Sequence, residues 1–248
     1  MSKLTEIEEK LRLQPDEPLL WLEKGLELTA LNRHYEAVEA YSRGLYLGGA
    51  RAELLLARGR RYISLHRWPE ALADLAEAAR LLPENFDNWY YQGATQALSG
   101  DYNRAAAAFE RCLPIVRAGD EAYLSPVAVW LWFVYTRLGR REDAAAAAAQ
   151  VTRETKELAA APSYKKIALL YKGETAPEGF IDESQPESAD PRARLYYITE
   201  TYHLANYYYA HGSVEESNAL LRRLKRITTH HYAFAYMLAR QDMALRGL

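Results

Sequence analysis

An all-α solenoid, built from paired helices that stack in a row, is the fold class that this sequence predicts. Three stretches of the chain superimpose at a fixed step of 34 residues, and a period of roughly 20–50 residues is typical of solenoids. Small residues recur at two positions of every stretch, as close packing between helices requires. No segment alternates apolar and polar residues as a half-buried strand would.

The repeat register consists of one large, two small and one final large position. These are Trp21, Leu55 and Trp89; Gly25, Gly59 and Gly93; Ala37, Ala71 and Ala105; and Tyr41, Leu75 and Phe109. A glycine inside a helix costs roughly 1 kcal/mol against alanine. Three glycines in register therefore indicate that the two helices of each repeat meet too closely for a side chain.

This pattern resembles the tetratricopeptide repeat (TPR), a pair of antiparallel helices. The resemblance implies a right-handed superhelix whose concave groove holds partners, and which performs no chemistry of its own. The same register places Asn32, His66, Gly100, Gly139 and Gly212 at the turn within each pair. Glycine and asparagine tolerate the left-handed conformation that ends a helix, and histidine does so occasionally. The chain is therefore expected to hold about five repeats.

We expect one solenoid domain over residues 1–248. Its parts are an N-terminal helix (1–17), repeats one to three (18–119), repeat four (125–158), an insertion (159–193), repeat five (194–229) and a capping helix (230–248). The N-terminal segment could cap the solenoid or pair with a second copy, which would make a homodimer.

The last two repeats begin with proline-containing pairs. Repeat four opens with Ser125-Pro126, read as a cap and first turn, and carries Trp132 at the small position. Repeat five opens with Asp190-Pro191. Between these repeats, Ser163 to Lys172 is amphipathic and predicts a docked helix, whereas residues 183–189 predict an exposed acidic loop.

The order of these segments resembles the C-terminal half of the NlpI-like family of bacterial TPR lipoproteins. The resemblance rests on WLWFVYTRLGRREDA, YKKIALLYKGETAPEGF and ETYHLANYYYAHGSVEESNALLRRL, within residues 125–245. It implies a dimeric adaptor that brings hydrolases or proteases to substrates. The sequence shows neither a signal peptide nor an N-terminal lipid-acceptor cysteine, so the family's membrane anchoring is not expected here.

Composition narrows the classes of partner and compartment. Lys and Arg total 31 against 33 Asp and Glu, a net charge of -2, which is too close to neutral for general attraction to nucleic acid. No apolar run reaches the ~18 residues of a membrane span. A single cysteine, Cys112, coincides with a small core position and fits a reducing compartment. We expect a soluble, cytoplasmic protein with no membrane insertion.

Motifs for chemistry are missing from the sequence. The six histidines include His203, His211, His230 and His231, but no cysteine or clustered carboxylate completes a metal-ligand set. No nucleophile elbow or phosphate-binding glycine loop occurs. We expect no metal, no cofactor and no enzymatic activity.

The predicted ligand surface is the concave groove, formed by fixed positions of each first helix. These positions select Leu19, Leu22, Leu26, Leu56, Arg60, Asp87, Tyr90, Phe133, Thr199, Tyr202, Asn206 and Tyr209. Aromatic and arginine side chains dominate protein interfaces, so we expect a protein or peptide partner. The alternative is a sensor that binds a small molecule or glycan beside Tyr202 and Tyr209.

Two further surfaces are not predicted to bind partners. A chaperone-tail carboxylate clamp is not expected, because the positions that would carry its Lys and Asn hold Leu22, Leu26, Asp87 and Tyr91. The basic run from Arg222 to Arg226 is interpreted as a solvated helix face in preference to a binding patch.

Overall fold

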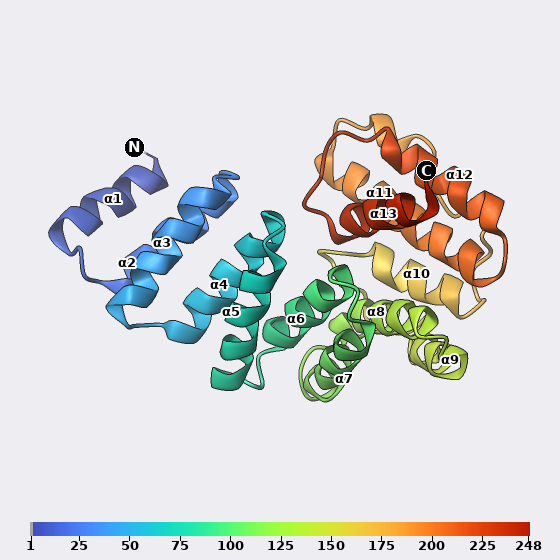
Figure 1. The fold of residues 1–248 in the computed structure, drawn as a ribbon, viewed down its shortest axis with the longest axis horizontal. Helices are drawn as coiled ribbons and strands as arrows, with labels where there is room; N and C mark the ends of the chain where they lie inside the picture. Colours follow the sequence, from blue (N-terminus) through green and yellow to red (C-terminus); the bar gives the residue numbers. More distant parts are fainter. Residues whose placement is uncertain (1) are drawn as a thin grey trace. The chain divides into compact units, whose positions relative to one another are not determined.

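The computed structural model describes residues 2–248, which form thirteen α-helices and two short 3₁₀ turns with no strand in that range (Figure 1). The predicted all-α class is therefore confirmed. The chain forms two compact units, Met1–Ser99 and Gly100–Leu248. One continuous solenoid over the whole chain stays a prediction.

The first unit contains two complete helix pairs and the first helix of a third. Its helices are α1 (Lys3–Leu13), α2 (Pro18–Ala30), α3 (His34–Leu47), α4 (Arg51–Ser64), α5 (Trp68–Leu81) and α6 (Phe86–Leu98). Each helix packs against the next one along the chain, and the first helices α2, α4 and α6 also contact one another in turn. This arrangement places their side chains on one shared face.

The recurring glycines lie where the two helices of a pair meet. A Cβ atom on Gly25 would lie 2.2 Å from Cε1 of Tyr41, and one on Gly59 would lie 3.0 Å from Cγ of Leu75. Tyr41 and Leu75 are the register's final large residues and are buried. Each glycine therefore makes room for the large residue of the second helix.

The turns within the pairs use the backbone conformation that the sequence predicts. Left-handed φ angles occur at Asn32 (58°), His66 (58°), Gly100 (78°), Gly139 (72°) and Gly212 (85°). At four of these turns, those at Asn32, His66, Gly139 and Gly212, the next amide in the chain bonds back to a helix carbonyl, as Arg67 does to Tyr62 at 2.8 Å. This pattern closes a helix C-terminus without leaving carbonyls unpaired.

Helix α1 covers the outer face of the first pair. Ile7 and Leu11 form a buried cluster with Leu20, against which Trp21 packs. Ser2 caps the helix by accepting a hydrogen bond from the Thr5 amide at 3.2 Å. This packing is compatible with the predicted cap, and pairing with a second copy stays a prediction.

The second unit contains repeats four and five and the terminal helix. Its elements are α7 (Tyr102–Ala118), η1 (Glu121–Tyr123), α8 (Leu124–Arg137), α9 (Arg141–Ala149), α10 (Ser163–Tyr171), η2 (Gln185–Glu187), α11 (Pro191–Ala210), α12 (Val214–Lys225) and α13 (Phe234–Arg246). The pairs α8/α9 and α11/α12 are the predicted repeats, and α13 packs against both helices of the last pair. Cys112 is fully buried within α7.

The predicted cap of repeat four is wrong, although the helix begins close to the predicted position. Helix α8 begins at Leu124, directly after η1, and Ser125 is buried inside the helix instead of capping it. Asp120 accepts a hydrogen bond from the Ala122 amide at 3.1 Å and begins the 3₁₀ turn. The 3₁₀ turn lies directly before α8. The repeat pattern did not predict it, because it lies outside the 34-residue register. Asp190 does cap α11, through the Arg192 amide at 2.9 Å.

The insertion supplies a docked helix, as predicted. Helix α10 contacts α8, α9 and α11, and its residues Ile167 and Leu170 are fully buried. Residues 182–190 are exposed or half-buried. The insertion therefore has an ordered core-facing half followed by an acidic surface loop.

Candidate functional site

The candidate binding surface of the first unit, called here the helix-A face, is formed by α2, α4 and α6. At its apolar end Leu19 and Leu26 are 55% and 52% exposed, and Leu22 between them is half-buried. The two exposed residues are seven positions apart, so they lie on one side of the helix two turns from each other. This spacing gives α2 an apolar stripe open to solvent.

The other end of the helix-A face is polar and aromatic. The guanidinium of Arg60 lies 4.4 Å from the ring centre of Tyr91 and 3.9 Å from an oxygen of Asp87. Tyr90 stacks on Phe86 with ring centroids 5.3 Å apart. Leu56, Arg60, Asp87 and Tyr90 are all half-buried, so this end offers rings and charges whose positions are set by their neighbours. Tyr91 is not among the predicted partner-binding residues, although it follows Tyr90 directly and occupies one of the positions considered for a carboxylate clamp.

Three predicted site residues in the second unit do not face solvent. Phe133, Tyr202 and Asn206 are 1%, 0% and 5% exposed, so the expectation that they line an open groove is wrong. Helix α13 packs over α11 (Figure 1) and supplies Asp242, which accepts a hydrogen bond from the Tyr202 hydroxyl at 3.0 Å. The alternative prediction, a small-molecule pocket beside Tyr202, is weakened for the same reason, because Tyr202 is buried and its side chain does not face an open pocket.

These side chains belong instead to a buried polar network. Arg137 donates to Asp242 at 2.5 Å and to the Asn206 side-chain oxygen at 2.9 Å. Burial opposes the charge of Arg137, but nearby Tyr202 and Asp242 raise its pKa overall. Burial, and next the charge of Asp242, raise the pKa of Tyr202 well above its usual value. The network ties α8, α11 and α13 together and is structural.

The remaining two predicted residues of the second unit, Thr199 and Tyr209, are more accessible than the three buried ones. Thr199 is half-buried, and its hydroxyl donates to the Leu195 carbonyl at 2.9 Å. Tyr209 is 44% exposed, with the Arg246 guanidinium 3.9 Å from its ring centre. Tyr209 is thus the one predicted groove residue of this unit with an exposed side chain.

The histidines have partners other than each other. The Nδ1 atom of His203 lies 2.7 Å from the Tyr171 hydroxyl, inside the core, and Nδ1 of His211 lies 2.7 Å from the Tyr207 carbonyl. Burial lowers the pKa of His203 to about 3. Within residues 2–248, no three His, Cys, Asp or Glu side chains gather as a metal site would need. No helix in this range is both long and apolar enough to span a bilayer.

These features define the class of protein: the fold is that of TPR solenoids, with paired helices closed by left-handed turns. No protein-family model matches the chain. No curated protein matches it either. Comparison with solved structures shows the same class.

Three similar structures span most of the chain. A tetratricopeptide repeat protein from Parabacteroides merdae is 14% identical, with a TM-score of 0.59, covering 95% of this chain and 89% of its own. YrrB, described as a TPR protein with an unusual peptide-binding site, is 14% identical, with a TM-score of 0.55, covering 95% and 97%. MamA is 18% identical, with a TM-score of 0.54, covering 69% and 87%. At these identities the likeness concerns the fold.

Proposed function

We propose that this protein is a non-enzymatic adaptor that binds a segment of a protein partner on the helix-A face. The observation that carries the proposal is the half-exposure of Leu19 and Leu26 on one side of α2. Leucines that line a helix face toward solvent gain free energy when a partner covers them, at roughly 25 cal/mol per Å² of apolar area.

The partner segment would lie with apolar side chains on α2 and a polar or aromatic anchor near Arg60 and Tyr90. Tyrosine and arginine make the largest contributions to interfaces when a neighbouring group already holds them in place. The contacts of Arg60 with Tyr91 and Asp87 provide that support. The similar structure of YrrB carries a peptide-binding site by its own description, which supports a peptide as the class of ligand.

The test uses charge substitutions on two exposed surfaces of the same unit. Partners captured from a lysate are identified, and their binding is then titrated with the parent, with Leu19→Glu/Leu26→Glu and with Tyr35→Glu. Tyr35 is 71% exposed on α3, a second helix of a pair, so it is the matched control. We expect the double variant to weaken binding by roughly 2–4 kcal/mol, as hot-spot losses do. A partner that binds the double variant normally but fails with Tyr35→Glu would place the site elsewhere.

A finer proposal concerns the second unit. We propose that it works as the NlpI-like half of a dimeric adaptor, supported by a helical insertion between its two repeats. Light scattering would test the dimer, since a concentration-independent monomer mass excludes it.

The cellular compartment and the absence of nucleic-acid partners are further proposals. A cytoplasmic bacterial location is supported by the single, fully buried cysteine, because reduced thiols are typical of that compartment. The near-neutral charge of -2 supports the absence of nucleic acid among the partners.

A further inference from the structure

In repeat two, an arginine at the start of the second helix is held between an aromatic ring and a carboxylate. The guanidinium of Arg67 lies 4.7 Å from the ring centre of Tyr62, the last large residue of the first helix. The same guanidinium donates to Glu70, in the first turn of the second helix, at 2.7 and 2.9 Å. The repeat therefore supplies every part of this arginine site itself.

Repeat four has the same arrangement at the same register positions. The guanidinium of Arg140 lies 4.4 Å from the ring centre of Tyr135 and donates to Asp143 at 2.7 Å. A planar guanidinium can stack on a ring while its edge pairs with a carboxylate. In both repeats the ring and the carboxylate thus have an arginine between them.

Repeat five has the ring and the carboxylate but lacks the arginine. The three register positions hold Tyr208, Ser213 and Glu216. The backbone is unchanged, with φ −82° and ψ 69° at Ser213 against −95° and 67° at Arg67. Among residues 2–248 no cation lies over the ring of Tyr208, and Glu216 forms no ion pair. The site is therefore complete except for its cation.

Tyr208 and Glu216 line a cavity of about 350 Å³ between the insertion and the last repeat. Its apolar lining includes the buried side chains of Phe180 and Leu220. Burial, and next the negative charges of Glu178 and Glu216, raise the pKa of Tyr208. The cavity thus joins apolar surface to an aromatic ring with negative charge beside it, an environment that favours a cation.

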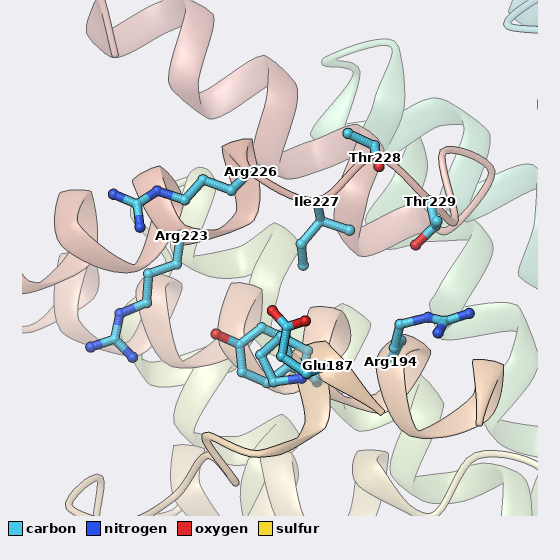
Figure 2. A pocket seen from close by; sticks show the side chains of 9 residues that line it. Glu187, Arg194, Arg223, Arg226, Ile227, Thr228 and Thr229 are labelled. Carbon is cyan, nitrogen blue, oxygen red and sulfur yellow. The ribbon is translucent and has the colours of Figure 1, made fainter. Parts of the chain in front are cut away.

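The one arginine that lines this cavity has a partner of its own. Arg223 donates to Glu183 at 2.5 Å. It also borders a neighbouring cavity, where Figure 2 shows its side chain extending away from Glu187. Within residues 2–248 it makes no ion pair with Glu216 and does not lie over Tyr208. Arg223 therefore does not supply the missing cation.

We propose that this cavity binds an arginine side chain of a protein partner, placed over the ring of Tyr208 and paired with Glu216. An apolar residue beside that arginine packs on Phe180 and Leu220. Three glutamates line the cavity against one arginine, so charge complementarity selects a basic segment. Arginine fits better than lysine because it stacks and pairs at the same time. The contact is independent of the helix-A face.

The probe is a fluorescein-labelled peptide with blocked ends in which arginine and leucine alternate, titrated against the full chain by anisotropy. A second peptide carries citrulline, the neutral analogue of arginine, and a third carries lysine. We expect saturable binding of the arginine peptide that salt weakens. The citrulline peptide should bind roughly three- to tenfold more weakly, because it carries no charge. The lysine peptide has the same charge without the planar group, so it should also bind more weakly than the arginine peptide.

A substitution at Ser213 tests the site from within the chain. Ser213→Arg introduces the residue type of repeats two and four, and Ser213 makes no capping bond that would be lost. The new arginine should fill the site, weaken peptide binding several-fold and raise the melting temperature by roughly 1–3 °C. Val214→Arg adds the same charge at an exposed position outside the cavity lining, so it should change neither quantity appreciably.

A pair of substitutions on α12 separates the site from general surface charge. Glu216→Gln should weaken binding of the arginine peptide by roughly three- to tenfold. Glu215→Gln should leave binding nearly unchanged, because Glu215 is also exposed but does not line the cavity. Leu26→Glu should have no effect, which keeps this result distinct from that of the helix-A face.

Several outcomes would overturn the proposal. Equal binding of the arginine and citrulline peptides would indicate an apolar contact alone, and equal losses in the two glutamine variants would indicate general attraction to acidic surface. Undiminished binding to Ser213→Arg would place the peptide outside this cavity. A dimer of the chain that Ser213→Arg dissociates would assign the cavity to a second copy.

Discussion

The ring of Trp132 lies flat on the ring of Tyr171, with centroids 3.5 Å apart and planes inclined by 15°. Trp132 occupies the position of α8 that holds a glycine in the first three repeats, and Tyr171 is the last residue of the insertion helix α10. The register places Ala148, sixteen positions later, where those repeats carry Tyr41, Leu75 and Phe109. Repeat four has thus exchanged large and small residues, and its large residue also docks the insertion.

The stack predicts that Tyr171 anchors the insertion. Tyr171→Ala should destabilise the second unit by roughly 3–5 kcal/mol, the range for removing a buried aromatic ring, and should make the α10 segment accessible to limited proteolysis. Chemical denaturation measures the first effect. Tyr171→Phe keeps the ring and loses only the hydroxyl, so it should cost about 1 kcal/mol. Equal costs for both substitutions would mean that the stack contributes little.

The glycine of the first repeat gives a second prediction. Gly25→Ala should cost roughly 1–3 kcal/mol through overpacking, because its Cβ would lie 2.2 Å from the Tyr41 ring, which is buried. Gly59→Ala should cost less, since its contact at 3.0 Å is with a Leu75 side chain that can adjust. Thermal unfolding of both variants is the measurement.

A double-mutant cycle tests the cause. Tyr41→Leu introduces the residue type that repeat two carries at this position, Leu75. Combining it with Gly25→Ala should cost less than the sum of the single changes. Strict additivity would show that Gly25 is required for a reason other than Tyr41.

The buried His203 predicts a stability that falls with acidification. Its folded pKa is lowered to about 3 by burial, whereas the unfolded chain has the ordinary value near 6.5. Between these values the unfolded state binds the additional proton, so the free energy of unfolding decreases as the pH falls. The contribution is about 2 kcal/mol between pH 7 and pH 5.

The measurement is denaturant unfolding at several pH values in the parent and in His203→Gln. The glutamine cannot titrate but retains hydrogen-bonding capacity toward Tyr171, so the variant should show a flatter pH dependence in this range. Parallel curves for the two proteins would assign the acid sensitivity to other groups.

The buried ion pair between Arg137 and Asp242 predicts that removing one partner destabilises the protein more than replacing both. Asp242→Ala should destabilise by roughly 3–5 kcal/mol, because Arg137 would remain buried without its counter-charge. The double change Arg137→Met/Asp242→Leu should recover much of that loss. Calorimetry compares the three proteins, and a double variant less stable than Asp242→Ala would show that the charges themselves are required.

The local features of this fold could be predicted from the sequence because neighbouring residues determine them. The five left-handed turns, the glycines facing large residues, and the cap at Asp190 all depend on contacts within one helix pair. The same reasoning identified the docked half of the insertion, since an apolar stripe must be covered. It assigned the wrong cap to α8, because a 3₁₀ turn outside the repeat register precedes the helix and places Ser125 inside it.

What the tertiary structure alone decided is which first-helix positions remain open. Leu19 and Leu26 on α2 and Tyr202 on α11 fulfil the same positional rule, yet the leucines are half-exposed and Tyr202 is fully buried. The difference arises from α13, whose Asp242 reaches Tyr202 from forty positions away. Periodicity specifies which side of a helix a residue occupies, but whether a distant helix covers that side depends on long-range packing that no repeat register contains.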